Sequence, residues 1–174
     1  MILFSRMGSR VAVIGGGAAG FFAAISCKIH HPDAQVQIIE KSSKLLAKVK
    51  ISGGGRCNVT NGVEGVGHFA KNYPRGEKQL KKAFSQFGSK DTIEWFENRG
   101  VKLKTEPDGR MFPTTDDSQT VIDCLQFECK RLKVEIKTSQ TVQSISSDSN
   151  GISLFINGTS QAFDKVIIAS GGQP

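Results

Sequence analysis

A glycine pattern near the beginning of the chain constrains the fold more than any other feature. The segment VIGGGAAG places Gly15, Gly17 and Gly20 in the order G-x-G-x-x-G. These glycines follow a short β-branched run, Arg10–Ile14, and open a segment, Ala18–Ile29, with small residues first and apolar residues after them. A buried parallel strand, a tight turn and a helix are expected from this order.

The same pattern predicts a nucleotide site. Gly15 permits the tight turn, Gly17 lets the backbone approach a pyrophosphate, and Gly20 lets the helix pack closely on the strand. Free N–H groups and the helix dipole at this point favour a phosphate dianion. A second apolar run, Gln35–Ile39, ends at Glu40, which lies 20 residues beyond Gly20. A carboxylate there accepts a hydrogen bond from a ribose 2′-hydroxyl and repels a 2′-phosphate, which argues against NADP.

The remaining segments predict an α/β fold with a helical insertion and a small antiparallel meander. Helices are expected over Glu77–Phe87 and Asp91–Asn98, and a hairpin around Pro107–Gly109. Asp116 or Asp117 is expected to cap a further helix. The later predicted strands are Thr141–Ser146, Gly151–Asn157 and Ser160–Phe163, which form the meander, and the buried run Lys165–Ser170.

Length and charge limit the function classes. The 174 residues suffice for one domain, expected over residues 10–174 after a ragged N-terminal stretch, residues 1–9. Lys and Arg outnumber Asp and Glu by 23 to 16, a net charge of +7. No basic block is longer than a pair such as Lys81–Lys82, and aromatic residues do not interleave with the basic ones. Nucleic acid is therefore not the expected partner.

The cysteines and the hydropathy pattern point to an intracellular protein. The four cysteines form no CxxC pair and the three histidines are not spaced as ligands, so neither a disulfide framework nor a metal site is expected. The apolar run at the start is too short for a secretory signal, and no run is long enough to span a membrane. A cytoplasmic or organellar location is expected.

Five segments carry a resemblance to a known family. GGGAAGFFAAI, KISGGGRCNVTN, NYPRG, EPDGRMFP and ASGG occur in this order. From Arg10 onward the chain resembles the BaiN-like family of FAD-dependent oxidoreductases, also described as aminoacetone oxidases or NAD(P)/FAD-dependent flavoproteins. The resemblance implies a glutathione-reductase-type, Rossmann-like FAD-binding domain with a parallel sheet, a β-meander and a helical insertion. It also implies an inserted domain and a completing C-terminal segment, so that this chain is an incomplete first part and inactive alone.

The resemblance implies FAD as the cofactor, NAD(P)H as a candidate electron donor and an unidentified small-molecule substrate. In related disulfide reductases the corresponding glycine loop carries two cysteines five positions apart. Cys57 is followed at that distance by Gly62, so dithiol chemistry is not expected. Gly53–Gly55 would offer N–H groups to phosphate or flavin oxygens, and Arg56 a fixed positive charge. A structural glycine turn around a buried Cys57 is the alternative.

The expected cofactor contacts come from several places in the chain, and no residue is a persuasive acid–base catalyst. Val142 is included because main-chain groups at this place hold adenine in related domains. Two rival functions stay open: a catalytically silent dinucleotide-binding fragment and a basic nucleic-acid-binding module. The residues predicted to bind the cofactor are Gly15, Gly16, Gly17, Ala18, Ala19, Gly20, Glu40, Lys41, Ser52, Gly53, Gly54, Gly55, Arg56, Cys57, Asn58, Val142, Ala169, Gly171 and Gly172.

Overall fold

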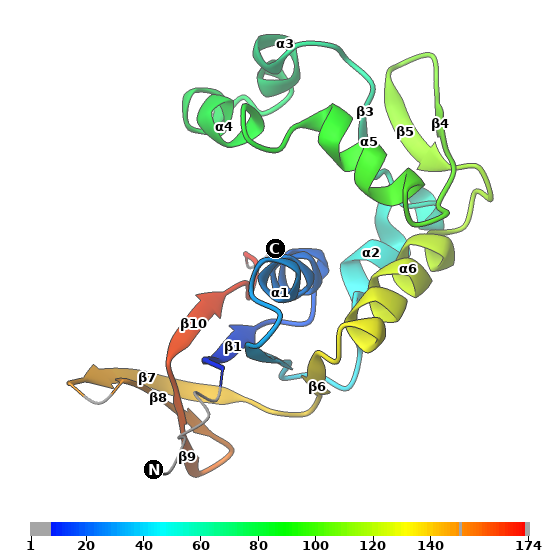
Figure 1. The fold of residues 1–174 in the computed structure, drawn as a ribbon. Helices are drawn as coiled ribbons and strands as arrows, with labels where there is room; N and C mark the ends of the chain where they lie inside the picture. Colours follow the sequence, from blue (N-terminus) through cyan, green and yellow to red (C-terminus); the bar gives the residue numbers. More distant parts are fainter. Residues whose placement is uncertain (1–7, 150, 173–174) are drawn as a thin grey trace, which may run out of the picture. The chain divides into compact units, whose positions relative to one another are not determined.

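The chain forms two compact units (Figure 1). The structure, a computed structural model, describes residues 8–149 and 151–172. Unit 1 comprises residues 1–48 and 125–174, and unit 2 comprises residues 49–124. The boundaries fall inside two helices, α2 (Ala47–Ile51) and α6 (Ser118–Arg131). Most of the expected N-terminal stretch, residues 1–7, lies outside the described residues.

A four-stranded parallel sheet forms the centre of unit 1. Its strands are β1 (Arg10–Ile14), β2 (Gln35–Ile39), β6 (Glu135–Lys137) and β10 (Lys165–Ile168). They run in the order β10-β1-β2-β6, and each neighbouring pair is parallel. The predicted β-α-β unit and the final strand are therefore confirmed. The predicted burial of that final strand is wrong, because β10 lies at the edge of the sheet and Ile168 is 68% exposed. The three-residue β6 was not predicted, because so short a run shows no periodicity.

One helix and a β-meander cover the two faces of this sheet (Figure 1). The helix is α1 (Ala18–His30). The meander consists of β7 (Val142–Asp148), β8 (Gly151–Ile156) and β9 (Thr159–Phe163), which pair antiparallel in chain order. All three meander strands agree with the segments that the sequence predicts.

Buried apolar side chains hold the layers of unit 1 together. Phe21 and Ile25 of α1 have no exposed surface. On β1, Ala12 points to the opposite face and joins a core cluster with Leu154 and Phe163 of the meander. Fully burying a side chain of this size contributes about 1.5–3 kcal/mol, so both layers contribute substantially to the stability of the sheet.

Unit 2 contains a small antiparallel sheet in the order β3-β5-β4. Its strands are β3 (Thr60–Asn61), β4 (Leu103–Thr105) and β5 (Arg110–Pro113). The hairpin predicted around Pro107–Gly109 is confirmed as the β4–β5 pair, with Leu103 opposite Pro113.

The helices of unit 2 are α3 (Val66–Lys71), α4 (Glu77–Phe84) and α5 (Ser89–Glu97). The two expected helices therefore exist with shifted ends. Helix α4 ends three residues earlier than expected, and α5 begins two residues earlier. The reason is at Gly88, whose N–H donates to Asp91 Oδ2 at 2.8 Å and fixes the start of α5 before the predicted position.

Asp117, and not Asp116, caps α6. The Gln119 N–H donates to Asp117 Oδ1 at 2.8 Å, which satisfies one of the unpaired donors of the first helical turn. Asp116 has a left-handed backbone with φ of 53°, and its carboxylate pairs with Lys104 instead. In the part of the chain that the structure describes, no helix has both the length and the apolar character needed to cross a membrane.

Candidate nucleotide-binding site

Gly15 forms the turn at which three strands of unit 1 end. Its φ of +117° is one that L side chains rarely adopt, and a Cβ there would overlap the carbonyl group of Ala169. The Gly15 N–H donates to Ile39 O at 2.8 Å, and the Ala169 N–H donates to Ile14 O at 2.8 Å. The carboxyl ends of β1, β2 and β10 therefore meet at this glycine, where ligands bind in open α/β sheets.

Gly20 is enclosed by neighbouring backbone, whereas Gly17 is exposed. Gly20 is buried, and a Cβ added to it would overlap the carbonyl oxygen of Gly15. Gly17 is the N-cap of α1, with φ of −90° and ψ of −175°, and no side chain caps the helix there. No heavy atom of the described residues lies within 4 Å of a Cβ built on Gly17, and Ala18 and Ala19 beside it are exposed. The helix thus presents an accessible N-terminus made of backbone, which suits a phosphate.

Glu40 organises the loop that leads to this helix. Its Oε2 accepts the Gly16 N–H at 2.7 Å and its Oε1 accepts the Ser42 N–H at 2.8 Å. Burial would raise the pKa of Glu40, but these hydrogen bonds outweigh it, so the pKa lies below the ordinary value of 4.5. The carbonyl of Gly16 in turn accepts the Leu46 N–H at 2.8 Å. The carboxylate therefore stays ionised, with lone pairs left for a further donor.

Other predicted residues of unit 1 lie along the same sheet edge. The Gln140 N–H donates to Glu40 O at 2.9 Å, which places the segment leading to Val142 beside Glu40. Val142 itself packs against the meander core, so only its main chain is available, as expected. Lys41 is exposed beside Glu40, and Lys48 Nζ donates to Gly172 O at 3.2 Å. Gly171 follows β10 with a φ of +73°.

The second group of residues predicted to bind the cofactor, Ser52–Asn58, belongs to unit 2. The backbone is left-handed at Gly53, Gly54 and Gly55, with φ of 56°, 70° and 88°, and at Cys57, with φ of 63°. A Cβ on Gly53 would lie 2.7 Å from Phe112 Cε1, whereas a Cβ on Gly54 would meet no described heavy atom within 4 Å. The glycine triplet is thus required by backbone conformation, and Gly54 presents exposed backbone.

Arg56 is held by partners that lie far away in the sequence. Its guanidinium stacks on the Phe112 ring at 4.0 Å from the ring centroid, pairs with Glu106, and lies 3.6 Å from Asp116 Oδ1. The hydrogen bond from Arg56 to Glu106 raises the pKa of the guanidinium further. The positive charge is fixed, as predicted, but two carboxylates offset much of it. Sequence reasoning missed these partners because they lie about 50 to 60 positions beyond Arg56.

Cys57 is buried, and its N–H donates to Ser52 O at 2.9 Å. Burial raises the pKa of the Cys57 thiol above its ordinary value, against a smaller opposing effect of a hydrogen bond with Ser52. A neutral, enclosed thiol of this kind is a poor nucleophile.

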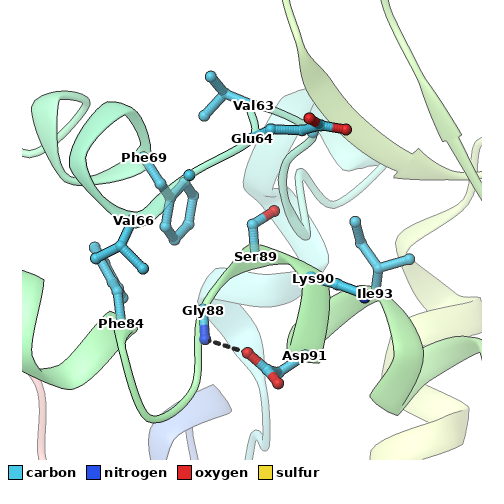
Figure 2. A pocket seen from close by; sticks show the side chains of 12 residues that line it. Val63, Glu64, Val66, Phe69, Phe84, Gly88, Ser89, Lys90, Asp91 and Ile93 are labelled. Atoms are coloured by element: carbon cyan, nitrogen blue, oxygen red, sulfur yellow. Dashed lines mark hydrogen bonds between the residues drawn. The ribbon is translucent and has the colours of Figure 1, made fainter.

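Unit 2 also has a pocket of about 590 Å³ (Figure 2). Its walls come from α3, α4 and α5 and from the loop before α3, with apolar side chains that include Phe69, Phe84 and Ile93. None of the residues predicted to bind the cofactor lines this pocket. The sequence analysis did not predict it, because its walls come from helices that no motif connects.

The geometry of unit 1 defines a dinucleotide-binding α/β domain of the Rossmann type: a glycine turn at the strand ends, a bare helix N-terminus and an ionised carboxylate after β2. A family model described as HI0933-like protein Rossmann domain matches residues 9–174, and the chain belongs to this family. The fold and the family together make it an FAD-binding domain of the flavin oxidoreductase class, which confirms the expected class of cofactor.

Two curated relatives are similar over most of the chain. One is the 3-dehydro-bile acid delta(4,6)-reductase of Clostridium scindens, 33% identical over 95% of this chain and 39% of its own length. Another is the ribosomal RNA dihydrouridine synthase of Escherichia coli, 31% identical over 92% of this chain and 38% of its own length. The chain therefore spans about two fifths of the length of these relatives.

Solved structures show the same fold at low sequence identity. The open conformation of a flavocytochrome c3 fumarate reductase matches with a TM-score of 0.73 and 18% identity, over 96% of this chain and 34% of that chain. A 3-ketosteroid-delta4-(5alpha)-dehydrogenase from Rhodococcus jostii matches with a TM-score of 0.65 and 16% identity, over 98% of this chain and 47% of that chain.

Glu40→Gln is expected to reduce stability near neutral pH and to weaken the retention of FAD several-fold. Because the folded-state pKa of Glu40 is lowered, its contribution to stability is complete above the unfolded-state pKa of about 4.5 and is lost as the pH falls through the folded-state pKa. Losing one charge-assisted hydrogen bond costs about 1.5–3 kcal/mol. Urea unfolding is measured from pH 3 to pH 7 in steps of about one pH unit. The free energy of unfolding should fall less steeply toward low pH in the variant than in the wild type. Glu64→Gln, at an exposed carboxylate, is the matched control, and an identical pH profile in both variants would contradict the assignment.

Proposed function

We propose that this chain is the FAD-binding part of a flavin-dependent reductase that saturates a carbon–carbon double bond conjugated to a carbonyl group. The observation that carries the cofactor part is the accessible N-terminus of α1 at Gly17, with the Glu40 carboxylate fixed beside it. The reaction part is drawn from the relatives, of whose length the chain spans about two fifths.

The residues of unit 1 suit the adenosine diphosphate half of FAD. The N–H groups at the start of α1 would hold the pyrophosphate, because a Cβ-free Gly17 allows close approach. Glu40 would accept a hydrogen bond from the adenosine ribose, whose 2′-hydroxyl is free in FAD. Main-chain groups near Val142 would meet the adenine. When bound, FAD supplies the two-electron transfer to the substrate, and the chain supplies binding and orientation.

The Ser52–Asn58 loop supports the proposal in a different way. Within unit 2, its exposed Gly54 backbone would offer N–H groups to a phosphate or carbonyl oxygen, and Ser52 and Asn58 would brace the loop. Arg56, fixed on Phe112 and paired with Glu106, would keep the loop in shape more than it would neutralise a phosphate.

The names of the two relatives share one kind of chemistry. A 3-dehydro-bile acid with delta(4,6) unsaturation is a conjugated ketone, and dihydrouridine is a uridine whose ring double bond, conjugated to a carbonyl, has been reduced. We therefore propose an electron-poor double bond as the substrate class. A uracil ring in RNA is the second candidate beside a small ketone. We further propose NAD(P)H as the electron donor and an intracellular location, where free thiols such as Cys57 persist.

Ligand selectivity tests the cofactor assignment directly. The purified chain is titrated calorimetrically with FAD, ADP and FMN in separate runs. FAD and ADP are expected to bind, while FMN, which lacks the adenosine diphosphate half, is expected to bind at least tenfold more weakly, a difference of about 1.4 kcal/mol. Binding of FMN as tight as that of FAD would overturn the placement of the pyrophosphate at α1. Turnover with an unsaturated ketone or with uridine-containing RNA is measured on a full-length relative.

Cys57→Ser is expected to leave FAD binding unchanged, and the corresponding substitution in a full-length relative is expected to leave its flavin reducible. The reason is the enclosed, protonated thiol with no partner cysteine at the expected spacing. Anaerobic titration with dithionite, followed by the flavin absorbance, measures this. Cys27→Ser, at a half-exposed thiol in unit 1, is the control substitution. A flavin that binds normally but resists reduction only in the Cys57 variant would show that the thiol takes part in the redox chemistry.

A further inference from the structure

The positive charge of the chain is concentrated in one helical segment of unit 2. Residues 66–90, here called the basic hairpin, comprise α3, α4 and the start of α5. The segment holds six basic residues and one acidic residue, a net charge of +5, out of +7 for the whole chain. All other residues together contribute only +2. The basic residues are Lys71, Arg75, Lys78, Lys81, Lys82 and Lys90.

Two aromatic side chains of the hairpin, Phe69 and Phe84, pack on each other and leave most of the cations on the surface. Phe69 of α3 packs on Phe84 of α4 with ring centroids 4.5 Å apart, and Tyr73 lies 5.2 Å from Phe84. On α4, Lys78 and Lys82 lie one turn apart, on the side away from Phe84. The hairpin is therefore a small packed unit whose outer face is cationic.

Most of this charge is not neutralised within the chain. Lys71, Arg75, Lys78 and Lys82 are exposed, and none of the four forms an ion pair with a residue of the described ranges 8–149 and 151–172. Lys81 and Lys90 differ, since Lys81 pairs with Glu77 at 2.8 Å and Lys90 lies 3.8 Å from a carboxylate oxygen of Glu94. Unpaired like charges held close together repel one another, and an anionic partner would relieve that repulsion.

Aromatic and apolar surface lies next to these cations. Tyr73 is 41% exposed and Phe87 is 38% exposed. Phe69 and Phe84 also form a wall of the pocket of about 590 Å³, whose charged lining residues are Lys90, Glu64 and Asp91 (Figure 2). A cationic face with accessible rings is the combination by which proteins hold single-stranded nucleic acid, because the phosphates meet the charges and the bases stack on the rings.

We propose that the basic hairpin binds the phosphate backbone of single-stranded or looped RNA. A membrane surface fits less well, since a membrane-binding helix needs an outward apolar face, and the apolar side chains of α4 pack inward. The choice of RNA over DNA rests on the proposed function, in which a uracil ring is a candidate substrate. The proposal runs against the expectation from sequence, which judged the basic residues scattered. Counted over residues 66–90 they form a cluster, and the fold leaves four of them exposed and unpaired within the described residues.

Two triple variants of equal charge test the hairpin. Lys71→Ala/Lys78→Ala/Lys82→Ala removes three cations from the hairpin, and Lys102→Ala/Lys130→Ala/Lys165→Ala removes three exposed cations elsewhere. Fluorescence anisotropy measures binding of a labelled RNA stem-loop, its DNA counterpart, and vesicles of phosphatidylserine in phosphatidylcholine, at several salt concentrations. Thermal melts verify that both variants are folded.

The hairpin variant is expected to lose at least tenfold in RNA affinity. Its affinity should also depend less steeply on salt, because each lost phosphate contact reduces the slope of log affinity against log salt concentration by about 0.7–0.9. The control variant should lose no more than about twofold to threefold.

Several outcomes would overturn the proposal. Equal losses in the two variants would show that the net charge of the chain, and not the hairpin, binds RNA. Binding of the wild-type chain to vesicles without binding to RNA, or tighter binding to the DNA stem-loop than to the RNA, would also refute it. The FAD titration separates this proposal from the proposed function: a chain that binds FAD but not RNA refutes only the hairpin, and one that binds RNA through the hairpin but no FAD refutes only the flavin site.

Discussion

Gly17→Asp is expected to abolish FAD retention while making the folded chain slightly more stable. Gly17 is the N-cap of α1 in an extended conformation that any residue adopts, and no heavy atom of the described residues lies within 4 Å of its Cβ position. Aspartate is among the best N-cap residues, better than glycine by a few tenths of a kcal/mol, and its charge favours the helix dipole by about 0.3–1 kcal/mol. The substitution is therefore expected to raise the stability of the folded chain.

The same carboxylate is expected to weaken the binding of FAD. The carboxylate of the variant would occupy the N–H groups that the pyrophosphate needs and would repel its charges at a separation of about 4 Å, which costs roughly 1–4 kcal/mol between water and a protein surface. A loss of affinity on the order of a hundredfold, about 2.7 kcal/mol, is expected. Flavin fluorescence titration measures the affinity, and thermal melting measures the stability. A variant that melts higher and still binds FAD like the wild type would place the pyrophosphate elsewhere.

The parts of the fold that were predicted from sequence are those set by neighbouring residues. The strand, turn and helix around Gly15 follow from a local pattern, since the backbone conformation and the close approach both require glycine there. The meander strands follow from alternation and turn residues. Strand β6, with three residues, has too little sequence for any periodicity to appear, and its place beside β2 is fixed only by pairing at long range.

The candidate site was predictable to a similar extent. Glu40 was assigned by its distance from Gly20, and the structure adds what the spacing does not show, namely that both carboxylate oxygens already accept N–H groups. The partners of Arg56 come from the β4–β5 hairpin and the loop after it, so no local pattern reveals them. The concentration of charge in residues 66–90 can be counted in the sequence, but the exposure of one cationic face depends on the packing of Phe69 on Phe84.

Gly20→Ala is expected to destabilise the chain by about 3 kcal/mol or more, or to prevent folding. In an ordinary helix this substitution stabilises by about 1 kcal/mol, because alanine has the higher helix propensity. At Gly20 the new methyl group would overlap the carbonyl oxygen of Gly15, a backbone atom whose residue is itself fixed by the Gly15 N–H bond to Ile39 O. Relief would require α1 to move away from β1 and to lose the packing of Phe21, a side chain with no exposed surface. Overpacking of this kind costs about 1–3 kcal/mol even where side chains can yield, so the steric cost outweighs the gain in propensity.

Gly17→Ala is the matched control for this prediction, since it makes the same chemical change three positions earlier. Alanine is a poorer N-cap than glycine, which costs up to about 1 kcal/mol, but its methyl group meets no described heavy atom within 4 Å. Urea unfolding followed by circular dichroism is expected to give a small loss for Gly17→Ala and a large one for Gly20→Ala, before any FAD is added. If both variants unfolded at the same urea concentration, the close contact between α1 and the Gly15 turn would be wrong, and the packing that places the helix N-terminus at the ends of β1 and β10 would be wrong with it.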